Sequence, residues 1–276
     1  MYFHYFPDKN QNKIMNRSQK IKLDDIYRQY NKASFVHPDP LEFLYFFKDI
    51  RDREIVGLIA SALAYGRVDM IIKSVSSVLD IMNKSPYLFL QNADKKFLLQ
   101  KYKQFRHRFA DGKNLAALLY GAKNVIDRFG SLNNCFVSGL SSDHKNILPA
   151  MTFFSDELIL SDNNPGHLIA RPEKGSACKR MNLFLRWMVR KDRVDPGGWN
   201  NIDKSKLIIP VDTHMHKIGV MLGFTSKKQA NMKTAIEITQ GFKNISPKDP
   251  AKYDFALTRF GIRKDMDIKS LYDLNL

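Results

Sequence analysis

Apolar side chains recur along this chain at the three- and four-residue spacing of helices, and few stretches alternate with the two-residue spacing of strands. The clearest run begins at Met181, where apolar residues follow three, four, seven and eight positions later. We therefore predict an all-α protein. The same spacing predicts further helices over residues 23–30, 41–48, 51–65, 69–82, 115–129, 132–137, 144–160, 227–242 and 251–260.

Turn-forming residues separate two groups of these helices. Residues 162–166 read Asp-Asn-Asn-Pro-Gly, the strongest loop signal in the chain. We place an approximate boundary between two interleaved helical lobes at residues 161–175, and we expect helices from both ends of the chain to close one cleft. Residues 18–276 then form one helical domain after a flexible tail over residues 1–17. The true start is either Met1 or Met15.

Two predicted helix starts contain residue types that can do chemistry together. Gly175 and Ser176 form a tight turn before the clearest helix, and free N–H groups at a helix start bind anions such as phosphate. Lys179 stands in the first turn of that helix. Asp212 is a good N-cap for a second helix that ends near Gly223. A lysine and an aspartate so placed can act as nucleophile and charge stabiliser at a sugar carbon.

These segments resemble the helix-hairpin-helix superfamily of DNA glycosylases, the group of endonuclease III and the 8-oxoguanine glycosylases. Residues 211–214, Val-Asp-Thr-His, look like the segment with the catalytic aspartate. Residues 175–179, Gly-Ser-Ala-Cys-Lys, are similar to the hairpin that ends in the catalytic lysine. Residues 54–64 resemble the helix that leads to the DNA-facing loop, so the resemblance covers residues 50–262. The closest overall similarity is to a bacterial family of conserved hypothetical proteins related to these enzymes.

The resemblance implies a helix-hairpin-helix fold and a base-excision repair enzyme. Such an enzyme acts on a flipped-out damaged base, for which an oxidised purine is one candidate. Lys179 would form a Schiff base with the sugar, which would also permit strand cleavage by an abasic-site (AP) lyase reaction, and Asp212 would stabilise charge. DNA phosphates would bind at Gly175, Ser176, Ala177 and Arg180. Contacts with the base or the DNA would come from Tyr65, Arg67, Asn182, Arg186, Trp199 and His214.

The segment between the two proposed catalytic residues departs from the pattern of the superfamily. Ala177 replaces the second glycine of the hairpin. Lys179 and Asp212 are 33 positions apart, further than in endonuclease III. The longer connection, with Asp-Pro-Gly-Gly-Trp at residues 195–199, looks more like the archaeal 8-oxoguanine glycosylase branch.

Composition favours a nucleic-acid partner and a reducing compartment. With 44 basic against 28 acidic side chains the formal charge is +16, which favours a polyanion such as duplex DNA through counterion release. A merely basic or ribosome-associated protein would show the same excess. Cys135 and Cys178 are too few for a secreted disulfide framework or for the four thiolates of an iron–sulfur cluster. Without a signal peptide or membrane span, we expect a cytoplasmic monomer that binds no such cluster and no other cofactor.

The proposed site residues also have plain structural interpretations. Lys179 can be a solvated helix residue, and Asp212 can be an ordinary N-cap. Tyr65 can pack inward at a helix–helix corner, and Trp199 can anchor a turn in the core. A non-catalytic helix-hairpin-helix protein that binds nucleic acid would contain the same residues but form no Schiff base.

Two further stretches leave alternatives open. Residues 101–109 interleave basic and aromatic side chains, which can hold phosphates and stack bases, although an amphipathic segment whose arginines reach solvent is the commoner explanation. His214 and His216 follow an apolar run, as in the metal-binding opening of amidohydrolase barrels. Only 60 residues follow His216, whereas most of such a barrel follows this motif. We therefore rank a metallohydrolase below the glycosylase and expect no metal.

Overall fold

The computed structural model of this chain describes residues 17–159, 164–263 and 265–273. The predicted flexible tail lies outside the described residues, except for Arg17, which begins the first helix. Residues 161–163 of the predicted lobe boundary lie outside them too. Within the described ranges the protein is essentially all-α, as predicted, and the only sheet there is one short hairpin.

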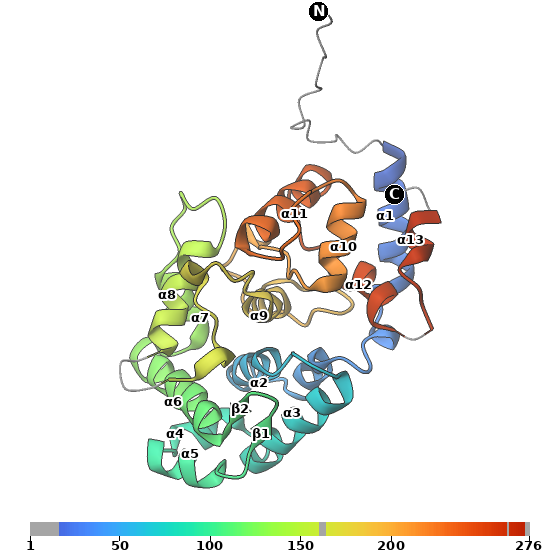
Figure 1. Cartoon of the computed structure of the whole chain (residues 1–276). Helices are drawn as coiled ribbons and strands as arrows, with labels where there is room; N and C mark the ends of the chain where they lie inside the picture. Colours follow the sequence, from blue (N-terminus) through green and yellow to red (C-terminus); the bar gives the residue numbers. More distant parts are fainter. Residues whose placement is uncertain (1–16, 160–163, 264, 274–276) are drawn as a thin grey trace, which may run out of the picture.

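The elements follow one another as short and medium helices (Figure 1). The α-helices are α1 (Arg17–Tyr30), α2 (Ile50–Ala62), α3 (Val68–Met82), α4 (Pro86–Gln91), α5 (Lys95–Lys101), α6 (Gly112–Phe129), α7 (Leu132–Ser138), α8 (Leu148–Leu158), α9 (Lys179–Val189), α10 (Thr213–Met221), α11 (Met232–Ile245), α12 (Asp254–Ile262) and α13 (Lys269–Asp273). The 3₁₀ helices are η1 (Ala33–Phe35), η2 (Pro40–Phe46), η3 (Gly166–Leu168), η4 (Pro172–Lys174) and η5 (Lys204–Lys206). The antiparallel strands are β1 (Arg106–His107) and β2 (Ala110–Asp111).

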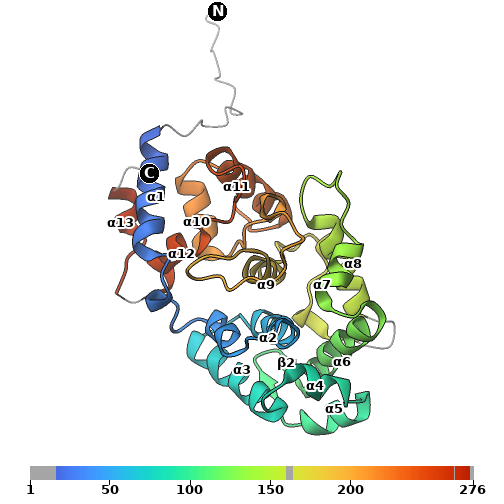
Figure 2. The same ribbon diagram turned by 180° about the vertical axis from the view of Figure 1, so that it is seen from behind.

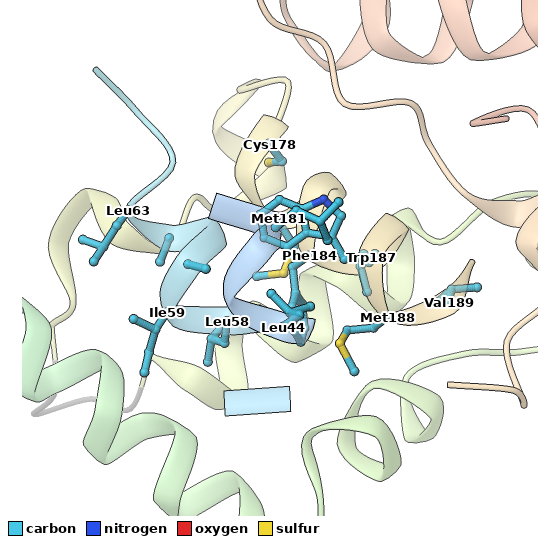
Figure 3. Close-up of a cluster of buried hydrophobic side chains, with 14 of the residues drawn as sticks. Leu44, Leu58, Ile59, Leu63, Cys178, Met181, Phe184, Trp187, Met188 and Val189 are labelled. Atoms are coloured by element: carbon cyan, nitrogen blue, oxygen red, sulfur yellow. The ribbon is translucent and has the colours of Figure 1, made fainter. Parts of the chain in front are cut away.

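Helices α2 and α9 pack against each other at the centre of the molecule, and both views show the other helices around them (Figures 1 and 2). Gly57 permits a close approach, because a Cβ added there would lie 3.3 Å from the Phe184 ring. Leu58 of α2 and Phe184, Trp187 and Met188 of α9 belong to the same buried cluster (Figure 3). This packing fixes the start of α9 beside the end of α2.

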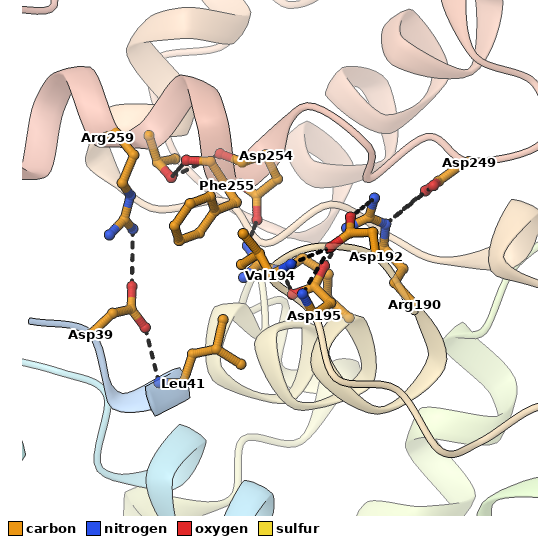
Figure 4. Close-up of polar contacts among 12 residues, drawn as sticks. Asp39, Leu41, Arg190, Asp192, Val194, Asp195, Asp249, Asp254, Phe255 and Arg259 are labelled. Atoms are coloured by element: carbon orange, nitrogen blue, oxygen red, sulfur yellow. Dashed lines mark hydrogen bonds and ion pairs between the residues drawn. The ribbon is translucent and has the colours of Figure 1, made fainter. Parts of the chain in front are cut away.

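Buried ion pairs brace the connection between α9 and α10 (Figure 4). Arg186 contacts Asp195 and Asp254, and Arg190 contacts Asp195 and Asp249. None of these side chains is more than 12% exposed. A buried charge left without its partner would cost several kcal/mol. The ion pairs therefore hold the connection and the start of α12 against α9.

The helix predicted over residues 227–242 begins later than expected. Helix α11 starts at Met232, where the Asn231 side chain caps it by accepting the N–H of Thr234 at 3.0 Å. The residues before it form a turn in which the N–H of Lys227 donates to Thr225 Oγ1. Several residues in this stretch can cap a helix, and local pattern alone did not identify the one that does.

Other corrections concern short elements. The stretch predicted over 41–48 is the 3₁₀ helix η2 rather than an α-helix, and the helix predicted over 144–160 is reduced to α8. Helices α4 and α5 and the β1–β2 hairpin were not predicted. Strands of two residues are too short to show an alternating pattern, so periodicity could not indicate them.

Helices α1 and α13 lie side by side at one edge of the molecule in both views (Figures 1 and 2). Helix α1 also packs against α12, so the first described helix contacts the C-terminal part of the described chain. Among the described residues, no helix combines the length and the apolar character that crossing a bilayer requires.

Candidate active site

A cavity of about 420 Å³ opens where segments far apart in the sequence meet. Its walls come from the start of η2, the turn between α2 and α3 with the first residues of α3, one face of α9, the start of α10, and α12. Both ends of the chain therefore contribute to one cavity. Its charged lining residues are Asp39, Lys179, Arg186, Asp212, Asp254 and Arg259.

Lys179 and Asp212, the two predicted catalytic residues, meet in this cavity. Lys179 is the first residue of α9, and its Nζ lies 3.8 Å from Asp212 Oδ2 and 3.5 Å from the carbonyl oxygen of Ala64. The Lys179 and Asp212 side chains remain 32% and 21% exposed, so both are reachable from the cavity. At this distance the contact is a loose ion pair rather than a close hydrogen bond. The fold thus brings an amine and a carboxylate together at one opening.

The Asp212 carboxylate is held in place by helix α10. Asp212 is the N-cap of that helix, as predicted, because its Oδ1 accepts the N–H groups of His214 and Met215 at 2.9 Å each. The other oxygen, Oδ2, faces Lys179. Capping therefore fixes the orientation of the carboxylate before any ligand arrives.

Asp254 is a second carboxyl group on the cavity wall. It is the first residue of α12, is 2% exposed and accepts a hydrogen bond from Arg186. Burial raises the pKa of Asp254 to about 6; Arg186 opposes this shift and the negative charge of Asp212 adds to it. Three carboxyl groups line the cavity, those of Asp39, Asp212 and Asp254, and the last two therefore differ in their environments.

Asn182 and Arg186, two predicted DNA contacts, are structural residues instead. Asn182 has no exposed surface, and its Nδ2 donates to the carbonyl oxygen of Ala177 at 3.1 Å. The Arg186 side chain is 4% exposed, and its guanidinium is engaged by Asp195 and Asp254. Both side chains are therefore buried by the fold, Arg186 against the connection to α10 and against α12, which explains why both predictions fail.

The turn before α9 is exposed only in part. Gly175 and Ser176 face solvent, and Gly175 has φ 79°, a conformation that favours glycine. Ser176 forms a bridge with Asn231, and the Gly175 carbonyl accepts the N–H of Met232 at 3.2 Å. Ala177 is 7% exposed. The predicted phosphate-binding turn thus has an accessible edge at two residues, whereas Ala177 packs into the core.

Arg180, also predicted to bind phosphate, is engaged inside the protein. Its guanidinium donates to the carbonyl oxygens of Ala62, at 2.8 Å, and His167. It also lies 4.9 Å from the centroid of the Tyr65 ring. Arg180 therefore joins α9 to α2, and this prediction is corrected. With Lys179 it borders a second cavity, of about 240 Å³, between the start of α9 and the end of α2.

Tyr65 and Arg67 lie in the turn between α2 and α3. Tyr65 borders both cavities, but its hydroxyl donates to the carbonyl oxygen of His107 at 2.8 Å and contacts His167 Nε2 at 2.7 Å. Burial lowers the pKa of both histidines, which keeps them neutral at pH 7. Tyr65 is therefore locked at a helix corner. Arg67 is exposed and forms an ion pair with Asp69 at 2.6 Å.

Trp199 does not offer a surface to a flipped base. It has no exposed surface, and its indole N–H donates to Glu54 Oε1 at 2.7 Å. Its ring contacts Phe136 and Phe184 in the core. The alternative interpretation, a core tryptophan that anchors the turn, is confirmed.

The two histidines of the alternative metal motif lie in different surroundings. His214 borders the cavity next to Gly261, where an added Cβ would lie 2.2 Å from His214 Nδ1. His216 Nε2 lies 2.8 Å from the carbonyl oxygen of Lys227, and that contact requires an N–H on this nitrogen. Across residues 17–159, 164–263 and 265–273, no three His, Cys, Asp or Glu side chains are grouped so that they could hold a metal ion.

Residues 39–263 match the family described as "Protein of unknown function (DUF2400)". The chain belongs to this family. The match includes Lys179, Asp212 and Asp254, and all the charged lining residues of the cavity lie within the DUF2400 region. Comparison with the curated proteins gave no match, and comparison with the solved structures gave none either. Membership in DUF2400 assigns no activity, and the chemistry must be inferred from the cavity itself.

The sequence did not identify several groups of this DUF2400 site, among them Asp254, His107 and His167. Asp254 reaches the cavity because α12 packs against α10, and no motif marks that contact. His107 and His167 hold Tyr65 from segments 42 and 102 positions away. Isolated histidines carry no spacing signal, so only the fold could show that they meet.

Proposed function

We propose that this DUF2400 protein is a base-excision DNA glycosylase with a helix-hairpin-helix fold, in which Lys179 is the nucleophile and Asp212 the charge stabiliser. The supporting observation is the 3.8 Å approach of the two partly exposed side chains within one cavity. Solvated lysines and N-cap aspartates are common separately. Their convergence from two helix starts is the arrangement that a Schiff-base glycosylase needs. The charge of +16 also suits a DNA substrate.

The reaction must begin with loss of a proton from Lys179, because an ammonium group is not a nucleophile. Asp212 is the carboxylate beside Nζ, and it can accept this proton and pass it to the departing base. The Nζ lone pair then forms a bond to C1′, while the glycosidic C1′–N bond breaks and its electron pair leaves with the base. Once it has passed this proton to the base, the Asp212 carboxylate is negative again and can stabilise the positive charge on the sugar.

Schiff-base formation and strand cleavage both proceed from the new bond between Lys179 Nζ and C1′. After Nζ loses its next proton, its lone pair forms a C1′=N bond while the C1′–O4′ bond breaks and O4′ takes up a proton. A base then removes a proton from C2′, the C2′–H electron pair forms a C2′=C3′ double bond, and the C3′–O3′ bond breaks with its electron pair leaving on the phosphate oxygen. This second step is the AP-lyase reaction, so one lysine accounts for both activities.

The target nucleotide has to leave the duplex to reach Lys179, because its sugar carbon is inaccessible within the stack. The cavity volume of about 420 Å³ falls in the range of small-ligand sites. Beside it, exposed Gly175 and Ser176 precede the start of α9, where backbone N–H groups can bind a DNA phosphate.

Base release from defined lesions tests this function. Duplexes containing 8-oxoguanine, an oxidised pyrimidine or uracil are incubated with the native protein and with Lys179→Gln and Asp212→Asn. Lys217→Gln is the matched control, since Lys217 is an exposed lysine on α10. We expect release from one lesion by the native protein and the control, and a loss of roughly 1,000-fold or more in Lys179→Gln.

The same assay distinguishes the alternative. Salt-sensitive duplex binding that is unchanged in Lys179→Gln, together with no base release from any lesion, would indicate a non-catalytic nucleic-acid-binding protein. Release that persists in Lys179→Gln would contradict the assignment of the nucleophile.

A further inference from the structure

The β1–β2 hairpin holds an aromatic ring out into solvent. Phe109 is 78% exposed, and with Arg108 it forms the two-residue turn between the paired residues His107 and Ala110. Arg108 has φ 51°, a conformation that non-glycine residues seldom adopt. His107 is fixed from two sides, by the Tyr65 hydroxyl on its carbonyl and by Ser74 Oγ on its ring. The exposed ring is therefore carried by a well-anchored turn.

A row of rings leads from this hairpin to the Lys179 cavity. The Phe109 ring lies 6.1 Å from the His167 ring, and the His167 ring lies 5.1 Å from that of Tyr65, which lines the cavity. The Arg108 side chain crosses Gly66, where an added Cβ would lie 2.7 Å from Arg108 Cδ. Because Gly66 also lines the cavity, the hairpin tip stands directly beside its wall.

The chain on either side of the tip is basic. Residues 101–113 contain a single acidic residue, Asp111, whose Oδ1 is occupied in capping α6. The basic residues of this stretch, all exposed, are Lys101, Lys103, Arg106, Arg108 and Lys113. Exposed cations around an exposed aromatic ring hold a phosphate backbone and stack a base. The positive charge favours a nucleic acid as the partner, rather than a protein with an apolar pocket for the ring.

We propose that Phe109 stacks on a base of the bound DNA, next to the nucleotide that enters the Lys179 cavity. Tyr65 and Trp199 cannot do so because both are engaged inside the protein. A single exposed phenylalanine is ordinary on a protein surface; the anchored turn, the adjoining cavity and the basic surroundings distinguish this one. The inference rests on the proposed function, because its partner is the DNA bound at that cavity.

Binding of a duplex that contains a tetrahydrofuran abasic analogue provides the first test. The affinity of native protein, Phe109→Ala and Phe46→Ala is measured by anisotropy of the labelled duplex. Phe46 is the matched control, since it is 74% exposed and lies on η2. We expect Phe109→Ala to bind roughly 5- to 150-fold more weakly, the effect of removing one stacked base, and Phe46→Ala to bind like the native protein. Equal affinities for all three proteins would overturn the inference.

A fluorescence measurement locates the ring directly. The natural Trp187 and Trp199 are buried, so Phe109→Trp introduces an exposed reporter, and Phe46→Trp serves as its control. We expect the emission of Phe109→Trp, and not that of Phe46→Trp, to be quenched as the duplex binds. Binding without quenching would overturn the stacking role alone. If the native protein failed to bind the duplex at all, the proposed function and this inference would both be overturned.

Discussion

Helix α9 contains two charged sites that differ in how fully their partners neutralise them. At its first residue, Lys179 has one loose ion pair with Asp212, and both side chains are partly exposed. About two turns later, the guanidinium of Arg186 lies between Asp195 and Asp254, and no side chain of this group is more than 4% exposed. The buried group acts as scaffold, whereas the loose pair at a cavity remains available for chemistry.

The two sites are close enough to influence each other. Asp254 lines the cavity and also binds Arg186, so one carboxyl group belongs to both. The scaffold thereby determines where α12 lies against the cavity. We infer that the stability of the protein depends on the second half of α9 and its reactivity on the first residue.

The largest effect on stability is expected at Asp195. Asp195→Ala removes a carboxylate that contacts both Arg186 and Arg190, which leaves buried positive charge without its partner. We expect the free energy of unfolding to fall by about 3–5 kcal/mol, measured by urea denaturation. Lys179→Gln breaks only a partly exposed ion pair and should change the free energy of unfolding by less than about 1 kcal/mol. Similar losses of unfolding free energy in the two variants would contradict the distinction between a buried scaffold and an exposed reactive site.

Residues whose role depends on local sequence were predictable, and residues whose role depends on distant segments were not. Asp212 was identified as an N-cap because capping involves only the next few residues. Asn182 and Arg186 were misplaced because their burial depends on how distant segments pack around α9. The start of α11 was missed because several residues before it can cap a helix, and local rules do not single out Asn231.

Glu54 is a third kind of buried ionisable group, one without a cationic hydrogen-bond donor. Glu54 accepts hydrogen bonds from the Trp199 indole and the N–H groups of Leu132 and Asn133. Burial raises the pKa of Glu54 to about 7 from an ordinary 4.5. The folded protein then retains a proton that the unfolded chain has released, so stability falls as pH rises through this range. The expected loss is on the order of 3 kcal/mol.

Glu54→Gln removes this titration while keeping a side chain that can accept hydrogen bonds. Urea midpoints of the native protein and the variant, measured across about pH 4.5 to 7, should show a smaller decline with pH for the variant. Parallel declines in the two proteins would mean that other groups determine the pH dependence.

The smallest expected effect on stability is at Asp212, where it distinguishes helix capping from the charge beside Lys179. Asp212→Asn retains a good capping side chain, whereas Asp212→Ala loses the hydrogen bonds to His214 and Met215. We expect Asp212→Ala to be less stable than Asp212→Asn by about 1 kcal/mol, as measured by thermal or urea unfolding. Both variants should lose base release, since both lack the charge beside Lys179. Full activity in Asp212→Asn would show that capping alone is required.

The central claim, that Lys179 is the nucleophile, is tested most directly by mapping the covalent adduct. The protein is incubated with a duplex containing the lesion from which it releases a base, the Schiff base is reduced with borohydride, and the digested adduct is analysed by mass spectrometry. We expect the sugar remnant to be attached to Lys179 and Lys179→Gln to yield no adduct. Attachment to another lysine, or spread over several surface lysines, would contradict it.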